Sequence, residues 1–275
     1  MASTLTVNNI LNSKRVTIPS FSTAPTSGNV RGDIAYINKI LSVYDGSKWK
    51  KWTDSATYIK DGLIRNIDWA KNGNSNEIQS NIQTIAIGGG GTFSQATNGS
   101  STFSYQEFTG SQALAINDVT ATNYVTVDIV YKPTSLANGD ESIIYNKENC
   151  WEIKNTSSQV QWAVWSNTQS WFWSNSGFSI TTGQWVHIVL TFDGSAVKMY
   201  KNGAIGVNYT TGYGNSVLAN QSSCYPKVNA RGCDTSSSSS AGAGGFAHFR
   251  IYNRALSDSE ITTNFNYAKQ VYGIT

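Results

Sequence analysis

The amino-acid sequence predicts an all-β protein: a two-sheet antiparallel jelly-roll sandwich with a small N-terminal β-meander and one C-terminal helix. Composition is the first observation, because 24 Gly against 4 Pro and a high content of Ser, Thr and Asn favour strands joined by turns. The second is a series of short alternations of apolar and polar residues, which are typical of strands. The third is the set of Asp-Gly and Asn-Gly pairs between them, which are typical of hairpins.

Residues 1–60 predict the β-meander. Its expected strands are the short pieces 5–7 and 15–18, followed by 33–37, 40–44 and 48–52. Two or three short strands bury too little apolar surface to be stable alone in water. The apolar side chains that therefore need a partner surface are Ile34, Tyr36, Leu41, Val43 and Trp49. We expect copies of this segment in other chains to supply that surface, and the chain's own sandwich is the alternative.

Residues 61–275 predict the sandwich, because many short strands follow one another at close spacing. The expected strands are 103–105, 113–116, 124–131, 142–145, 150–153, 160–165, 185–192, 196–200, 204–207 and 246–252. The clearest hairpin joins 185–192 to 196–200 through an Asp-Gly-Ser turn. Alternate residues of its first strand are predicted core: Val186, Ile188, Leu190 and Phe192. Ser257 and Glu260 fit a capping box, which predicts the closing helix.

The stretch 209–245 has no periodicity, which predicts an exposed and mobile loop. It contains Cys224 and Cys233, which would form a disulfide in an oxidising environment. In a cytoplasm they would stay reduced, as would Cys150, and the sequence leaves both alternatives open.

Charge and composition exclude several classes of protein. The 20 Lys and Arg residues against 17 Asp and Glu give a net charge of +3, so no field favours nucleic acid or a membrane surface. No stretch approaches the ~20 apolar residues of a membrane helix, and the N-terminus lacks a signal-peptide pattern. With 2 His and 3 Cys in the chain, we expect His187 and His248 to be structural and expect no metal site.

Paired carboxylates are the other test of catalysis. Retaining glycosidases need carboxyl groups about 5–5.5 Å apart, and inverting ones about 6.5–9.5 Å. On one strand, Glu148 and Glu152 would lie ~13 Å apart at ~3.3 Å per residue. The adjacent side chains of Asp140 and Glu141 should diverge in a turn. We therefore expect no enzyme activity and no catalytic residue.

Aromatic residues are concentrated in the stretch 151–185. Trp162 is predicted core, and Trp165 falls on the opposite face of its strand. Trp171 and Trp173 share a face in a polar setting, and ring faces beside amides and hydroxyls suit a sugar. The predicted glycan-binding residues are Trp165, Trp171, Trp173, Tyr213 and Tyr225. Burial of Trp171 and Trp173 between the sheets is an equally open alternative.

Two motifs carry a family resemblance. They are Trp185-Val-His-Ile-Val-Leu-Thr-Phe-Asp-Gly194 with Lys198-Met-Tyr-Lys-Asn-Gly203, and Phe249-Arg-Ile-Tyr-Asn-Arg-Ala-Leu-Ser-Asp-Ser-Glu-Ile261. With Asp61-Gly-Leu-Ile64, they make residues 61–275 resemble the concanavalin A-like lectin/glucanase superfamily in its laminin-G-like branch. The resemblance implies two curved antiparallel sheets. Some relatives bind Ca²⁺ through loop oxygens that map onto no residues here, so we expect no cofactor and leave Ca²⁺ open.

The N-terminal segment resembles parts of phage fibre and other virion proteins, on the residues Gly32-Asp-Ile-Ala-Tyr36 and Val43-Tyr-Asp-Gly-Ser-Lys-Trp49. Such proteins are commonly homotrimeric. We therefore expect a virion structural protein, a tail fibre or capsid decoration protein, assembled in the host bacterial cytoplasm. Residues 1–60 would oligomerise and attach, and 61–275 would contact host-surface glycans.

The partners expected for such a protein are copies of itself, other virion proteins and a glycan, but neither nucleic acid nor a membrane. A free-standing bacterial carbohydrate-binding lectin module is the alternative function.

Overall fold

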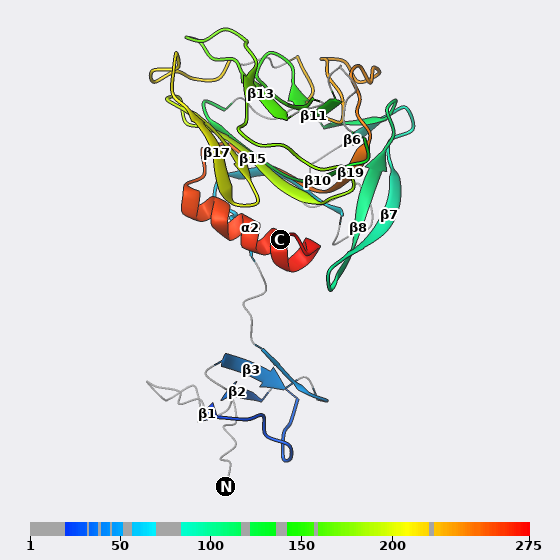
Figure 1. Ribbon diagram of the computed structural model, residues 1–275, viewed down its shortest axis with the longest axis vertical. Helices are drawn as coiled ribbons and strands as arrows, with labels where there is room; N and C mark the ends of the chain where they lie inside the picture. Colours follow the sequence, from blue (N-terminus) through cyan, green and yellow to red (C-terminus); the bar gives the residue numbers. More distant parts are fainter. Residues whose placement is uncertain are drawn as a thin grey trace. The chain divides into compact units, whose positions relative to one another are not determined.

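The computed structural model of the protein describes residues 20–31, 33–37, 40–44, 46–51, 57–69, 84–116, 122–135, 142–156, 159–219 and 223–275. The chain divides into two compact units, Met1–Thr57 and Tyr58–Thr275. The first holds a small sheet, and the second holds a β-sandwich with the helix α2 (Asp258–Tyr272) (Figure 1). The expected strands at 5–7 and 15–18 lie outside the described residues. Among the described helices, none has the length and apolarity to cross a membrane.

The N-terminal unit forms a four-stranded sheet. In spatial order, its strands are β1 (Ser20–Phe21), β2 (Ile34–Ile37), β3 (Ile40–Tyr44) and β4 (Trp49–Lys51). The antiparallel register pairs Ala35 with Ser42, which are only 1% and 4% exposed. Because directly opposite residues share a face, these two mark the buried face of the sheet.

Ile34 and Val43, two of the predicted interface residues, occupy the other face. The register pairs Ile34 with Val43, one position along from the buried pair. Ile34 is 39% exposed and Val43 is half-buried. The register also pairs Tyr36 with Leu41, whose side chains lie outside the described residues. One face of the sheet therefore presents apolar side chains.

Trp49 does not share that face. It pairs with Tyr44, the residue after Val43, so the strand pleat places it on the opposite side. Its ring centroid lies 5.6 Å from that of Tyr44, and its indole N–H donates to the carbonyl of Pro25 at 3.2 Å. The β3–β4 register therefore separates Trp49 from the face that carries Ile34 and Val43, and the sequence did not show this register.

Two antiparallel sheets face each other in the second unit. The eight-stranded sheet has the order β17-β16-β15-β10-β19-β8-β7, with β5 also paired to β19, and the seven-stranded sheet has the order β14-β13-β12-β11-β18-β9-β6. The strands are β5 (Leu63–Asp68), β6 (Thr84–Ile87), β7 (Thr92–Asn98), β8 (Ser101–Phe108), β9 (Ala113–Ile116), β10 (Val125–Pro133), β11 (Ser142–Lys147), β12 (Trp151–Asn155), β13 (Val160–Val164), β14 (Ser174–Asn175), β15 (Val186–Phe192), β16 (Val197–Lys201), β17 (Ala204–Tyr209), β18 (Lys227–Val228) and β19 (Gly244–Tyr252). This architecture confirms the predicted all-β jelly-roll sandwich.

The hydrophobic core fills the space between the two sheets. The alternate residues of β15 that the sequence predicted to be core are all buried there: Val186, Ile188, Leu190 and Phe192. Trp162 of the seven-stranded sheet is fully buried in the same core, as expected. The β15–β16 turn needs glycine at position 194. Gly194 has a φ of 89°, and the Cβ of any other residue there would clash with the Ser216 carbonyl.

Helix α2 covers the outer face of the eight-stranded sheet (Figure 1). It begins at the predicted capping box, where the Ser257 side chain accepts from the Glu260 N–H and the Glu260 carboxylate accepts from the Ser257 N–H. It ends at Gly273, which has a left-handed φ of 63° and donates to the Lys269 carbonyl. Local capping thus sets both ends of the helix.

The described part of the stretch 209–245 differs from the exposed loop that its composition predicts. A disulfide joins Cys224 to Cys233, and β18 pairs between β11 and β9. Tyr213 and Ala230 are fully buried. A cross-link and bonds from side chains to the backbone order such a loop, and neither leaves a period in the sequence.

Candidate functional site

The stretch 171–173, between β13 and β14, places alternate aromatic side chains on opposite sides of the chain. Phe172 packs on the core, with its ring centroid 5.7 Å from that of Trp162. Trp171 and Trp173 are half-buried and lie outside that core. Their ring centroids are 5.6 Å apart and the ring planes meet at 88°. The sequence left open whether these rings are buried between the sheets or lie on a sugar-binding surface. In the structure they are not buried between the sheets.

Strand β12 lies beneath Trp173. Its alternation sends Ile153 into the core and leaves Glu152 and Lys154 on the outer face of the seven-stranded sheet. Lys154 Nζ lies 3.5 Å from the centroid of the Trp173 ring, and the guanidinium carbon of Arg231 lies 5.5 Å from it. Cations beside an indole face attract it, so they help to hold the ring in one orientation.

A row of polar side chains crosses the same outer face. The register aligns Lys154 of β12 with Gln161 of β13, and Gln161 with Asn175 of β14. Gln161 Nε2 donates to Asn175 Oδ1 at 2.9 Å, in an exposed position. Because Trp173 lies over Lys154, the row and the aromatic pair adjoin. We call the set of Trp171, Trp173, Lys154, Gln161 and Asn175 the Trp173 surface.

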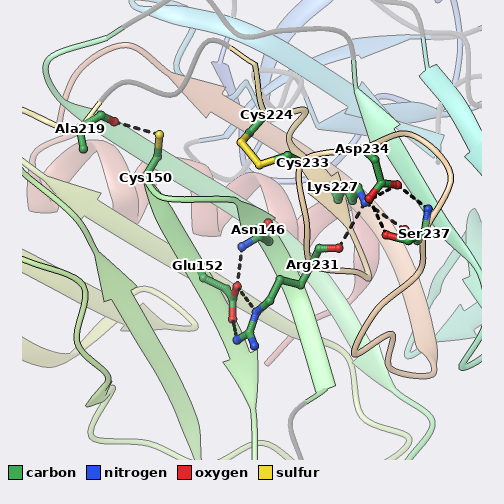
Figure 2. The surroundings of a disulfide bond; sticks show 10 residues. All are labelled: Asn146, Cys150, Glu152, Ala219, Cys224, Lys227, Arg231, Cys233, Asp234 and Ser237. Carbon is green, nitrogen blue, oxygen red and sulfur yellow. Dashed lines mark hydrogen bonds and ion pairs between the residues drawn. A yellow bond between two sulfur atoms is a disulfide. The ribbon is translucent and has the colours of Figure 1, made fainter.

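The buried carboxylate of Glu152 ties this surface to the 223–243 segment (Figure 2). Arg231 donates from Nε to Glu152 Oε2 at 2.9 Å and from Nη2 to Oε1 at 2.5 Å, and Asn146 donates to Oε2 at 2.5 Å. The pKa of Glu152 is raised, chiefly by burial and also by the charge of Glu148. The hydrogen bonds from Arg231 and Asn146 act to lower this pKa but do not outweigh burial. The ion pair fixes Arg231 beside Trp173.

Lys227 and the disulfide hold the backbone around Arg231 (Figure 2). The Lys227 side chain is fully buried, and its Nζ donates to the carbonyls of Arg231 at 3.2 Å and Ser237 at 2.9 Å. It also lies 3.6 Å from Asp234 Oδ1. Burial lowers the pKa of Lys227, and the Asp234 carboxylate opposes this shift. The segment is thus ordered by its own internal bonds.

The acid pair considered from the sequence has a different geometry. Glu148 lies in the turn between β11 and β12, so the along-strand separation of ~13 Å from Glu152 does not apply. Both Glu152 oxygens accept hydrogen bonds, and the side chain is fully buried. Its carboxylate therefore serves as a structural anchor in this arrangement. Asp140 and Glu141 lie outside the described residues.

Tyr213 is corrected from a surface residue to a core residue. Its side chain is fully buried in the core, and its hydroxyl donates to the Val164 carbonyl at 3.0 Å. Trp165 is half-buried at the end of β13, and Tyr225 packs on the small cluster that includes Ala230. Among the described residues, neither of these two rings stacks with Trp171 or Trp173.

Sequence reasoning missed four residues of this region: Lys154, Gln161, Asn175 and Arg231. For Lys154 and Gln161 a signal was present, because the alternation that buries Ile153 and Trp162 places them on the outer face. Arg231 comes from a stretch without a period, so no sequence pattern predicted its position.

Three possible metal ligands, Asp128, His187 and His248, meet under α2, although their sequence spacing shows no metal motif. Nε2 of His187 and Nε2 of His248 lie 3.1 and 2.5 Å from Asp128 Oδ1, and one ligand atom from each residue lies within 4.8 Å of the others. Arg250 Nη1 is 3.3 Å from His248 Nε2. A guanidinium charge therefore faces the nitrogen that a cation would need, and the group fits a buried hydrogen-bond network better than a metal centre.

Comparisons with known proteins agree on the sandwich. A family model described as the concanavalin A-like lectin/glucanases superfamily matches residues 106–262. No curated protein sequence matches the chain. A similar solved structure is domain 4 of AbnA, an extracellular arabinanase from Geobacillus stearothermophilus, in complex with arabinotriose. It is 20% identical, with a TM-score of 0.55, over 73% of this chain and 96% of that one.

Two toxin domains are also similar to the chain. The binding domain of Paraclostridial Mosquitocidal Protein 1 is 13% identical, with a TM-score of 0.60, over 74% of this chain and 52% of that one. The ligand binding domain of botulinum neurotoxin serotype D, in complex with N-acetylneuraminic acid, is 12% identical, with a TM-score of 0.55, over 75% and 51%. The chain thus spans about half the length of each toxin domain.

At these low identities the solved structures show a shared fold alone. The family model is the stronger evidence, because it covers more than half of the chain and includes the hairpin of β15 and β16 and the start of α2. The chain belongs to the concanavalin A-like lectin/glucanases superfamily.

Proposed function

We propose that the sandwich is a non-catalytic carbohydrate-binding domain and that the Trp173 surface contacts the glycan. The observation that carries the proposal is the pair of half-buried, nearly perpendicular rings of Trp171 and Trp173 outside the core. Beside them lie the amides of Gln161 and Asn175. A sugar offers apolar C–H faces that stack on rings and hydroxyls that bond to amides, so the surface matches both parts of such a ligand.

The similar solved structures support the proposal. Domain 4 of the arabinanase, 96% of which the match covers, is in complex with arabinotriose, so a sandwich of this type accommodates a saccharide. The neurotoxin domain is in complex with N-acetylneuraminic acid, and the match covers 51% of it. These two ligands differ in charge and size, which makes a broad panel of glycans the right starting point for this chain.

Binding of the full chain to an array of bacterial surface glycans tests the proposal. The double variant Trp171→Ala/Trp173→Ala should bind at least about tenfold more weakly, because each lost ring removes a stacking contact. Phe93→Ala is a matched control, because Phe93 is an aromatic residue of β7 that is 42% exposed. Equal binding by wild type and the double variant, to every glycan that is bound, would overturn the proposed site.

The proposal excludes catalysis and a cofactor. Support comes from Glu152, whose carboxylate bonds to Arg231 beside Trp173: this side chain is buried, and both of its oxygens accept hydrogen bonds. We expect no release of reducing sugar from any bound glycan over a day of incubation. We also expect unchanged glycan affinity after EDTA treatment. Product release or loss of affinity would contradict these two expectations.

We further propose that the protein is a phage virion structural protein, a fibre or decoration protein, in which residues 1–60 oligomerise and attach. The apolar face of the N-terminal sheet supports this, since Ile34 is 39% exposed and pairs with Val43 there. A second copy covering that face would remove the apolar surface from water. The virion protein that we propose is a homotrimer that displays its sandwich domains to host-surface glycans, and a free-standing bacterial carbohydrate-binding lectin module is the alternative.

Sedimentation of the full chain separates these two functions. A trimer that becomes monomeric in Ile34→Asp/Val43→Asp supports the virion role. Val30→Asp is the control, because Val30 is 64% exposed in the same unit and lies off the sheet. A wild-type monomer would favour the free-standing lectin module instead.

A further inference from the structure

A cavity of about 520 Å³ opens where four stretches of the sandwich unit meet. Its lining comes from the β7–β8 turn, the loop before β15, the turn after β16 and the segment after α2. The residues are Asn98, Gly99, Ile180, Thr181, Gly183, Gln184, Trp185, Val186, Lys201, Asn202, Gly273, Ile274 and Thr275. No residue of the Trp173 surface lines it. A volume of this size is typical of sites for small ligands.

The cavity has an apolar floor and one aromatic wall. Ile180, Val186 and Ile274 are each buried to 5% exposure or less. Trp185 is half-buried, and Phe103 and Tyr105 contact its ring edge to face, each with centroids 5.1 Å apart. These neighbours fix the ring before any ligand arrives, which lowers the entropy cost of binding.

Polar side chains form the rest of the wall. Asn202 Nδ2 donates to a main-chain oxygen of Thr275 at 2.9 Å, and Asn98 Nδ2 donates to the Gly273 carbonyl at 3.1 Å. These bonds hold the turns and the segment after α2 together around the opening. The framework of the cavity is therefore built by hydrogen bonds between distant parts of the chain.

The rim offers hydrogen-bonding groups to a ligand. Thr181 and Gln184 are both exposed, and among the described residues their side chains form no hydrogen bond within the protein. No acidic side chain lines the cavity. The cationic side chain in the lining, Lys201, directs its Nζ to the Ser179 carbonyl at 2.7 Å. The side chains thus favour an uncharged, hydroxyl-rich ligand.

We propose that this cavity is a second saccharide site, separate from the Trp173 surface, that takes a neutral mono- or disaccharide unit. The C–H face of the sugar packs against Trp185 and the apolar floor, and its hydroxyls bond to Thr181 and Gln184. The site does not depend on the function proposed for Trp171 and Trp173, because no residue is shared between the two.

The test uses the full chain carrying Trp171→Ala/Trp173→Ala, so that only the cavity site is measured. Calorimetric titration with glucose, galactose, mannose, N-acetylglucosamine and lactose should show binding of at least one of them. Thr181→Trp fills the opening from an exposed position and should weaken this binding at least about tenfold, and Gln184→Ala should weaken it about fivefold.

Thr182→Trp is the matched control, since Thr182 is the exposed neighbour of Thr181 and does not line the cavity. Equal affinity of the Thr181→Trp and Thr182→Trp proteins for the bound sugar would overturn the proposal, as would no binding of any of the five sugars. Either result leaves the test of the Trp173 surface unaffected, because that test compares the wild type with the Trp171→Ala/Trp173→Ala protein on an array.

Discussion

Arg231 and Glu152, 79 residues apart in the sequence, form a two-pronged ion pair on the outer face of the seven-stranded sheet. The Glu152 side chain is fully buried and the Arg231 side chain is 28% exposed. Removing one partner of a buried pair leaves an uncompensated charge, whereas replacing both partners by apolar residues is often close to neutral. The buried Glu152 charge therefore needs Arg231 as its partner, and this ion pair anchors the 223–243 segment to the sheet.

Arg231→Ala should lower the free energy of unfolding by about 3 kcal/mol, because it leaves the Glu152 carboxylate buried and unpaired. The double variant Arg231→Met/Glu152→Leu should lower the free energy of unfolding by less than half as much, because it leaves no buried charge. Urea unfolding at pH 7 measures both. Lys198→Ala is the control, since its pair with Asp258 is exposed and should contribute at most about 0.5 kcal/mol. A double variant as unstable as Arg231→Ala would contradict this account.

The disulfide should stabilise the same segment. Cys224 and Cys233 are 9 residues apart in the sequence. In the chain-entropy model, a cross-link that closes a loop of that length in the unfolded chain raises the free energy of unfolding by about 2.5 kcal/mol. Reduction should therefore lower the urea midpoint.

Reduction should also weaken glycan binding at the Trp173 surface, because Arg231 lies within the closed loop. Cys224→Ala/Cys233→Ala should reproduce both effects without reductant. Cys150→Ala is the control, because Cys150 is a buried thiol outside the disulfide. A reductant effect that persists in the Cys224→Ala/Cys233→Ala protein would refute the assignment to this bond.

The regular parts of this fold were predictable from local pattern. The alternation along β15 predicted its buried face, and Ser257 with Glu260 predicted the start of α2, because both signals arise within a few residues. Trp171 and Trp173 could be grouped for the same reason: residues two apart in an extended chain share a side.

The remaining parts depend on contacts between distant residues. Nothing near Arg231 in the sequence indicates its pairing with Glu152, and Tyr213 is buried because its loop folds back over the core. The face of Trp49 depends on the β3–β4 register, which the turn sets. The meeting of His187 and His248 on Asp128 joins three strands and has no signature in spacing.

Tyr213→Phe tests the corrected position of that residue. The hydroxyl donates to the buried Val164 carbonyl at 3.0 Å, so its removal should lower the free energy of unfolding by about 1 kcal/mol. Glycan binding should not change, because the ring is within the core. Tyr225→Phe is the control, since Tyr225 is half-buried outside that core. A loss of glycan binding without loss of stability in Tyr213→Phe would restore a surface role.

The network under α2 should make stability depend on pH. His248 is fully buried and faces Asp128 of β10, His187 of β15, Asp68 of β5, Arg250 of its own strand, and Tyr267 and Tyr272 of the helix. Burial and the charge of Arg250 lower the pKa of His248 to about 4, against the attraction of Asp128 and Asp68. Burial acts to raise the pKa of Asp128, but the charges and hydrogen bonds of His187 and His248 outweigh it and hold the pKa well below its usual range.

Because the pKa of His248 is about 4 in the folded protein and 6.5 in the unfolded chain, only the unfolded chain binds this proton between those values. The free energy of unfolding should be highest above pH 6.5 and fall by about 3 kcal/mol towards pH 4, at ~1.4 kcal/mol per pKa unit. Asp128 is an acid whose pKa is lowered in the folded protein. Its contribution to stability is therefore lost only below its usual pKa of 3.8, outside this pH range. Urea unfolding at pH 7.5, 6.5, 5.5 and 4.5 measures the fall. His248→Gln keeps a donor towards Asp128 but does not titrate, so its stability should decline less steeply, and an unchanged slope would show that other groups cause the pH dependence.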